Sequence, residues 1–316
     1  MHKFNTSRVQ IVIATLMIFI DVIVAQKQVA ITIDDVPNVK KYKIDRGMSL
    51  LKQIDFLNIP VTIFINEQRL SNGPDPNVNA AYLRKWIENP NVIIGTHTYS
   101  HLRYSQVTLD SFKSDVIRGM KETKELASPL GKTIDYFRFP YNDAGKDEQQ
   151  HKAAQDMLDS IGLISTPFTV ESSDWMFNAL YEYYLAKDSI VQAKKILSAY
   201  IGATMRSFEW MDTLTAAQYG RSVKHIFLCH DNAITADCLP SIIDLLRKKG
   251  YEIIDLNMAM KDPIYTQESH YYKKWGISWV YRWIDDPERR QQLMKEEPGI
   301  MPYYELYQRI LSGEGY

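Results

Sequence analysis

Two histidines and two adjacent carboxylates have the residue types and spacing to bind a metal. His97 and His101 lie four positions apart, so on a helical turn their imidazoles would share one face and could share a cation. Asp34 and Asp35 end an apolar, β-branched stretch that begins at Ala30 and predicts a buried strand. Adjacent acids repel each other, and a cation at one of them would separate their roles. Two histidines and one carboxylate leave positions open for water and substrate, as in catalytic metal sites.

Each of these features also has a structural explanation. A histidine pair at this spacing can occur by chance, and two acids after a strand can be a solvated exit into a loop. The wider pattern of strands and helices therefore has to decide whether the groups meet.

Apolar runs alternate with amphipathic segments along the chain, and the apolar runs do not show the alternation of half-exposed strands. Strands are expected at 30–36, 61–65, 92–94, 135–139, 165–170, 223–229 and 251–254, and helices at 41–58, 77–88, from 108, 146–161, within 172–221 and after 231. This order predicts an α/β fold, a distorted (β/α)7-type barrel with parallel strands. An open doubly wound sheet is the alternative. In a barrel, polar residues at the carboxyl ends of the strands converge on one rim.

Those rim residues form five short motifs, and with them the chain resembles the polysaccharide deacetylases of carbohydrate esterase family 4. In the family's order, the motifs are matched by residues 32–37, 97–101, 138–141, 174–175 and 228–231. Val36 departs from the family, which usually has Gly there, so this turn cannot depend on a positive φ at position 36. Ile33 replaces an aromatic residue, and Glu171 and Ser172 stand where the family often has another Asp.

The resemblance implies a divalent metal, zinc in the first instance, bound by Asp35, His97 and His101. It makes Asp34 the catalytic base. Arg138 would hold this base ionised, because a guanidinium does not lose its charge.

The resemblance also implies a catalytic acid, His230, with Asp174 to orient the ring and keep it protonated. The implied substrate-binding residues are Tyr141, Trp175, Pro140 and Leu228. Tyr141 would stabilise an oxyanion through its backbone N–H, and Trp175 would form an apolar wall for the acetyl methyl group. A core aromatic is the alternative for Trp175.

The first 25 residues have the features of an export signal. Lys3 and Arg8 precede an apolar run, and Ala25 provides a small residue at its end. Asp21 and the limited length argue against a stable membrane span in this segment, and no span is expected once it is cleaved. An uncleaved anchor is the alternative. The protein is therefore expected to be exported, to the periplasm or the extracellular space.

Composition adds further limits. The net charge is −1, which gives no indication of a nucleic-acid partner and disfavours a strongly charged substrate. Cys229 and Cys238 could form a disulfide in an exported protein, but a buried free thiol is the alternative for Cys229.

The chain is expected to divide into the signal (1–25), the catalytic domain (26–256) and an aromatic-rich, mostly helical extension (257–316). The extension holds eight Tyr and three Trp and no Phe. Trp279 and Trp283 lie four apart and could share a helical face. Such aromatics could stack on sugar rings, but packing of the extension against the barrel is the favoured interpretation.

The expected function is exported, metal-dependent hydrolysis of N-acetyl groups, with O-acetyl groups second, on a carbohydrate polymer or oligomer. Hydrolysis of a small non-sugar amide and non-catalytic glycan binding are the alternatives. Imidase and allantoinase relatives usually alter the acid pair or the last histidine, and a binding protein would lose the base or the metal ligands. Asp34 and His230 are both present, which favours the sugar enzyme.

Overall fold

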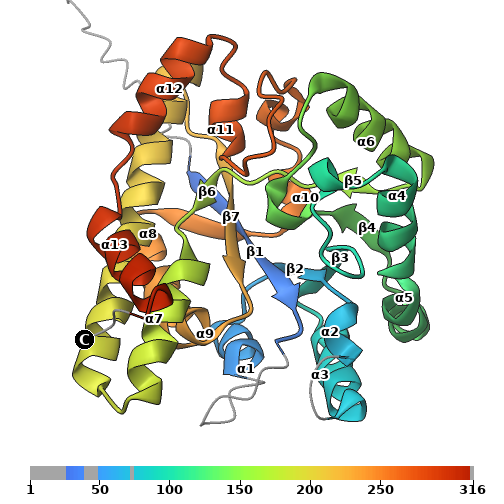
Figure 1. Ribbon diagram of the computed structural model, residues 1–316, viewed down its shortest axis with the longest axis horizontal. Coiled ribbons are helices and arrows are strands. Elements are labelled where there is room, and N and C mark those ends of the chain that lie inside the picture. The colour runs from blue at the N-terminus through green and yellow to red at the C-terminus, as the bar shows by residue number, and fades with distance from the viewer. Residues whose placement is uncertain (1–25, 39–48, 72–74, 314–316) are drawn as a thin grey trace, which may run out of the picture.

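The computed structural model describes residues 26–38, 49–71 and 75–313, which form a curled parallel sheet with helices around it (Figure 1). The predicted signal at 1–25 lies outside the described residues. The predicted helix at 41–58 is described from Ser49 onward, where helix α1 (Ser49–Leu57) begins. Among the described residues, no helix combines the length and apolar character needed to cross a membrane.

The sheet has the parallel strands and the curvature expected of a distorted (β/α)7-type barrel. Its strands are β1 (Lys27–Val36), β2 (Val61–Ile65), β3 (Val92–Thr96), β4 (Ile134–Phe137), β5 (Ile164–Ser165), β6 (Val170–Glu171), β7 (Lys224–His230) and β8 (Tyr251–Ile254). Their order is β5-β4-β3-β2-β1-β7-β6, with β8 also paired to β1. The predicted barrel is confirmed, and the sheet is open between β5 and β6 in the described part of the chain.

The strand expected at 165–170 is wrong. Two separate two-residue strands, β5 and β6, take its place on different sides of the sheet. Pro167 lies between them, and a proline has no N–H to donate to a β-ladder.

Strand β1 is the centre of the sheet because it has three partners. It pairs along one side with β7, and along the other side first with β8 and then with β2. Ile31 and Ile33 are fully buried within it, which explains its continuous apolar sequence. The parallel register sets Asp34 opposite His230 at the carboxyl end of the pair.

The helices surround the sheet (Figure 1). After α1 they are α2 (Gln68–Ser71), α3 (Pro76–Glu88), α4 (Leu109–Arg118), α5 (Lys121–Ala127), α6 (Glu148–Ser160), α7 (Asp174–Ala186), α8 (Ile190–Tyr219), α9 (Ala233–Lys248), α10 (Leu256–Ala259), α11 (Trp279–Arg282), α12 (Pro287–Glu296) and α13 (Met301–Leu311). The side chains of Asp147 and Asn232 cap α6 and α9 by accepting backbone N–H groups of the first turn. Cys229 and Cys238 are buried free thiols.

The C-terminal residues pack on the barrel through apolar rings and backbone hydrogen bonds. Trp279 contacts Phe168 edge-on at 5.5 Å between ring centroids, and its backbone N–H donates to the Phe168 carbonyl at 3.0 Å. Trp283 packs edge-on against Tyr265 of the extension itself, at 5.8 Å. Trp279 therefore fits the packing of the extension on the barrel. Farther along the chain, α13 lies beside α7 (Figure 1), where Tyr303 contacts Phe177.

Gly276 provides a test of how tightly the extension is seated. A Cβ atom at this position would lie 2.4 Å from the Tyr141 carbonyl oxygen, so Gly276→Ala must push two backbone segments apart. We expect a loss of about 1–3 kcal/mol in the free energy of unfolding, measured by denaturant titration. Gly299→Ala is the matched control, because nothing lies within 4 Å of its Cβ position. Equal stability of the two variants would contradict the close contact.

Candidate active site

A cavity of about 700 Å³ opens at the carboxyl ends of the strands. This size is typical of a small-molecule or cofactor site. The structure brings most of the residues singled out from the sequence to its walls: Asp34, Asp35, His97, His101, Tyr141, Trp175, Leu228 and His230. Arg138, Pro140 and Asp174 are buried behind these walls and do not line the cavity.

Asp35, His97 and His101 form a cluster in which one ligand atom from each residue lies within 4.8 Å of the others. The imidazole centroids of the two histidines are 4.9 Å apart. The predicted helical turn between them is wrong. His97 directly follows β3, and Thr98 and His101 take left-handed φ values of 66° and 58°. The Thr98 hydroxyl accepts the His101 backbone N–H at 3.0 Å, so a tight loop brings the two rings together.

The protonation of the cluster suits a cation. Burial lowers the pKa of His97 and of His101 to about 4, so both rings are neutral at neutral pH. His97 Nδ1 lies 2.9 Å from the Arg138 carbonyl oxygen, which can only accept, so Nδ1 is the donor and Nε2 keeps its lone pair for the cavity.

The Asp35 carboxylate is turned toward the two histidines by its backbone. Asp35 itself takes a positive φ of 65°, within an irregularity in the β1–β2 pairing, and Val36 does not. The expectation that Val36 stays out of the left-handed region is confirmed. The Asp35 Oδ1 atom is buried with no hydrogen-bond partner among the described residues and lies 3.5 Å from His101 Nε2. An unpartnered carboxylate oxygen beside two neutral imidazoles is a donor set that fits a divalent cation.

Arg69 is a residue of the site that the sequence analysis missed. Its Nη2 atom lies 2.6 Å from Asp35 Oδ2. Burial alone would raise the pKa of Asp35, but the Arg69 guanidinium and the nearby histidines lower it to about 2. The residue comes from the short helix α2 and belongs to none of the motifs, so no local pattern marked it.

Asp34 is held by a fully buried arginine. Arg138 Nη1 donates to Asp34 Oδ1 at 3.0 Å and to the Thr32 hydroxyl at 2.8 Å. Burial raises the pKa of Asp34 above its usual range, while the charge of Arg138 acts in the opposite direction. Asp34 is therefore a carboxylate whose proton affinity is higher than that of the neighbouring Asp35.

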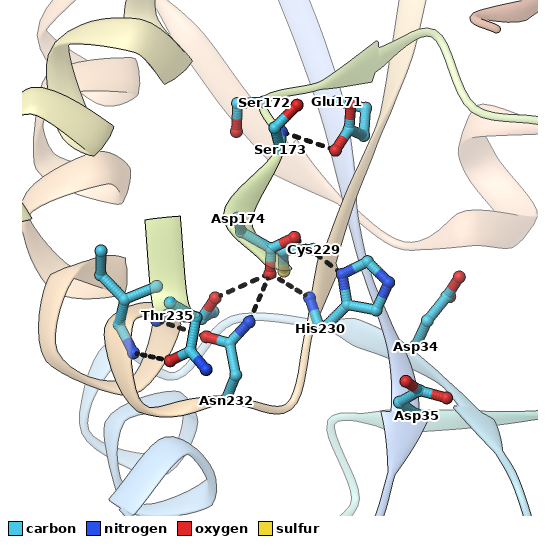
Figure 2. A network of polar contacts seen from close by, with 12 residues as sticks. Asp34, Asp35, Glu171, Ser172, Ser173, Asp174, Cys229, His230, Asn232 and Thr235 are labelled. Carbon is cyan, nitrogen blue, oxygen red and sulfur yellow. Dashed lines mark hydrogen bonds and ion pairs between the residues drawn. The ribbon is translucent and has the colours of Figure 1, made fainter. Parts of the chain in front are cut away.

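His230 and Asp174 form the second half of the site (Figure 2). Asp174 Oδ1 lies 2.7 Å from His230 Nδ1, and Asp174 Oδ2 accepts from the His230 backbone N–H, from Asn232 Nδ2 and from the Thr235 hydroxyl. Burial alone would lower the pKa of His230, but the Asp174 carboxylate raises it to about 10. In Figure 2 the His230 ring lies between Asp174 and Asp34. Asn232 and Thr235 were not identified from the sequence.

Tyr141 and Trp175 both contribute rings to the cavity wall. Tyr141 takes a left-handed φ of 57° in the turn Pro140–Asn142, and its ring packs edge-on against His101 at 4.5 Å. Trp175 is 48% exposed and contacts Tyr307 edge-on at 5.6 Å, so it is not a core aromatic. Leu228 is buried but reaches the cavity wall.

Several further residues of the cavity wall were not marked by a motif match, among them Glu171, Trp275 and Gly276. Glu171 lines the cavity, and burial and the neighbouring Asp174 raise its pKa to about 7. Trp275 and Gly276 come from the C-terminal extension. The aromatic richness of that segment was the one available signal, and it did not single out Trp275.

Comparison with known proteins agrees with this geometry. Residues 21–157 match the family model described as polysaccharide deacetylase. No curated protein gives a significant sequence match.

Three solved structures are similar in fold. One is a CE4 family pseudoenzyme from Bacillus anthracis, with 14% identity, a TM-score of 0.53, and coverage of 75% of this chain and 66% of that chain. Another is the Bc1960 peptidoglycan N-acetylglucosamine deacetylase, with 18% identity, a TM-score of 0.51 and coverage of 74% and 88%. A family 4 acetyl xylan esterase from Clostridium thermocellum, in complex with a cobalt ion, has 20% identity, a TM-score of 0.50 and coverage of 74% and 90%. The chain thus spans about two thirds of the pseudoenzyme's length. Residues 21–157 are therefore similar to a polysaccharide deacetylase domain, and the chain shares the fold of these three structures.

Proposed function

We propose that the protein is a metal-dependent deacetylase that hydrolyses N-acetyl groups on a carbohydrate polymer or oligomer. One observation carries the proposal. His230, which a buried carboxylate keeps protonated, faces the same cavity as the buried Asp34 carboxylate. Both lie beside the cluster of Asp35 and two histidines that suits a cation. Two titratable groups with pKa values moved apart in this way provide an acid and a base for hydrolysis.

Asp35, His97 and His101 would hold the metal, and zinc is the ion that this donor set suits best. Bound there, the ion would act as a Lewis acid toward the acetyl carbonyl and lower the pKa of water. The neutral imidazoles and the low pKa of Asp35 mean that no proton has to leave the ligands at neutral pH.

Asp34 would take one proton from the attacking water while the water oxygen forms a bond to the acetyl carbon. The backbone N–H of Tyr141 would stabilise the negative charge that develops on the carbonyl oxygen. His230 would then donate its proton to the nitrogen as the C–N bond breaks. The products are acetate and a free amine.

The protonated state of His230 favours an amide over an ester as the substrate. An amine is a poor leaving group unless it is protonated as the bond breaks, whereas an alkoxide depends less on the acid. Trp175 and Leu228 provide apolar surface beside these groups, which suits the methyl group of an acetyl substituent.

Two alternatives are separable from this proposal. A non-catalytic glycan-binding role is raised by the pseudoenzyme among the similar folds, but Asp34 and His230 are both present and both ion-paired here. Hydrolysis of a small non-sugar amide is the other alternative, and the substrate that releases its product separates it from deacetylation of a sugar. Acetate release from N-acetylglucosamine oligomers, lost with a chelator and restored by zinc, would support deacetylation. No release from any glycan would contradict it.

We also propose that the protein is exported and acts on a cell-wall or extracellular glycan. The basis is the sequence of residues 1–25, with its positive start, apolar run and small residue at the end. Fractionation of cells with an antibody to the protein would test this, and a cytoplasmic location would contradict it.

Removal of one imidazole tests the metal site. Loss of a group that only hydrogen-bonds a metal ligand typically lowers metal affinity by roughly 10–100-fold. His97→Ala removes a ligand itself and should weaken zinc binding by more than this, measured by competition with a chelating dye. His270→Ala is the matched control, because this histidine is exposed and outside the cavity. Zinc affinity that is the same in both variants would contradict the assigned ligand set.

The base and the acid should be needed for turnover and not for metal binding. Asp34→Asn and His230→Ala are each expected to lower kcat for acetate release by roughly 10²–10⁴-fold, because each removes one proton-transfer group. Zinc content, measured by elemental analysis, should stay at the wild-type level in both. Wild-type turnover in either variant would rule out its proposed role.

The pH dependence tests the partnership of Asp174 with His230. A catalytic acid acts in its protonated form, so turnover should be lost as pH rises through the pKa of His230, about 10. The negative charge of Asp174 raises this pKa, so Asp174→Asn should move the alkaline limb of the pH–kcat profile to lower pH. An alkaline limb that does not move would contradict the electrostatic role of Asp174.

A further inference from the structure

Trp275 lines two cavities of the described part of the chain. It borders the cavity of the proposed active site and also a second cavity of about 430 Å³. The second cavity is lined in addition by Ser105, Gln106, Lys146, Lys273 and Lys274. The indole therefore lies between the active-site cavity and the second cavity.

The indole ring of Trp275 is exposed, although its backbone is fixed. The side chain is 60% exposed, whereas Trp279 packs against Phe168 of the barrel and Trp283 packs against Tyr265 of the extension itself. The Trp275 carbonyl oxygen accepts hydrogen bonds from Arg282 Nη2 at 3.1 Å and from the Ile277 N–H at 3.0 Å. The ring of Trp275 thus faces water beside two cavities, while its backbone is held in place.

The segment that carries Trp275 is joined to the turn that carries Tyr141. Arg282 is fully buried, and its Nη2 atom also donates to the Asn142 carbonyl at 2.8 Å. Its guanidinium lies 4.0 Å from the centre of the Trp279 ring. Gly276 touches the Tyr141 carbonyl so closely that no side chain could be accommodated. The backbone of Trp275 is thus held at a fixed place relative to the proposed oxyanion site.

The polar groups around the second cavity complement an aromatic surface. Lys274 Nζ lies 5.2 Å from the centre of the Trp275 ring. Lys146 and Lys273 form no ion pair with another described residue. An aromatic face packs well on the C–H face of a sugar ring, and hydrogen-bond donors at its edge can reach the hydroxyl groups.

We propose that Trp275 is the platform of a second sugar-binding subsite, which the C-terminal extension adds next to the acetyl-binding site. The substrate is then an oligomer or polymer that occupies at least two neighbouring subsites, and not a single sugar. This inference rests on the proposed carbohydrate deacetylase function, and it makes Trp275 a positioning residue and not a catalytic one.

Substitution of Trp275 should separate binding of a long substrate from the chemistry. In the full-length, zinc-loaded protein, Trp275→Ala should raise the Kd for an N-acetylglucosamine tetramer, measured by calorimetry, and the KM for its deacetylation by roughly tenfold. The kcat for the tetramer should change far less than its KM, because the proposed base and acid are left in place. Trp275→Phe keeps an aromatic face and should restore most of the tetramer affinity.

Tyr304→Ala is the matched control. Tyr304 is also an exposed aromatic residue of the extension, but it lies outside both cavities, so its removal should leave tetramer affinity unchanged. An unchanged Kd and KM in Trp275→Ala would overturn the subsite even if acetate release supports the deacetylase. Tetramer binding that depends on Trp275 without any acetate release would support the subsite and contradict the proposed reaction.

Discussion

The ion pair between Arg138 and Asp34 is the interaction on which the rest of the site depends. Both side chains are almost completely buried, and a buried charge is costly unless its partners are in place. The guanidinium also donates to the Thr32 hydroxyl and to the Pro167 carbonyl, and the backbone carbonyl of Arg138 fixes the tautomer of His97. Arg138, the residue directly after β4, thus ties the end of β1 to the proposed metal cluster beside β3. A change at this position would disturb the proposed base and the proposed ligands together.

The histidines in the two halves of the site differ in protonation state, and the physical reasons are opposite. Burial keeps the rings of His97 and His101 neutral, because it outweighs the opposing effect of the Asp35 carboxylate on their pKa values. His230 is also partly buried, yet its contact with Asp174 keeps it charged. The same residue type therefore provides neutral ligands on one wall and a proton donor on the other. Parallel pairing of β1 with β7 brings these opposed environments together.

The sequence predicts the fold and the main site residues well where the signal is local or repeats along the chain. The apolar runs ending in polar residues located the strand ends, and the parallel barrel followed from them. The turn at 97–101 was predicted as helical because spacing alone cannot distinguish a helix from a loop with left-handed residues such as Thr98. Arg69 and Trp275 could not be found, because each reaches the cavity through packing between segments distant in the sequence.

The extension shows why composition alone could not decide between packing and binding. Both interpretations predict many aromatic residues, and both apply here to different members of the segment. Trp279 packs against the barrel, and Arg282 beside it holds the backbone that presents Trp275 to water. An exposed indole on an ordered backbone loses no further backbone freedom when it binds a ligand. Packing of one tryptophan is therefore the physical condition that makes another a suitable binding surface.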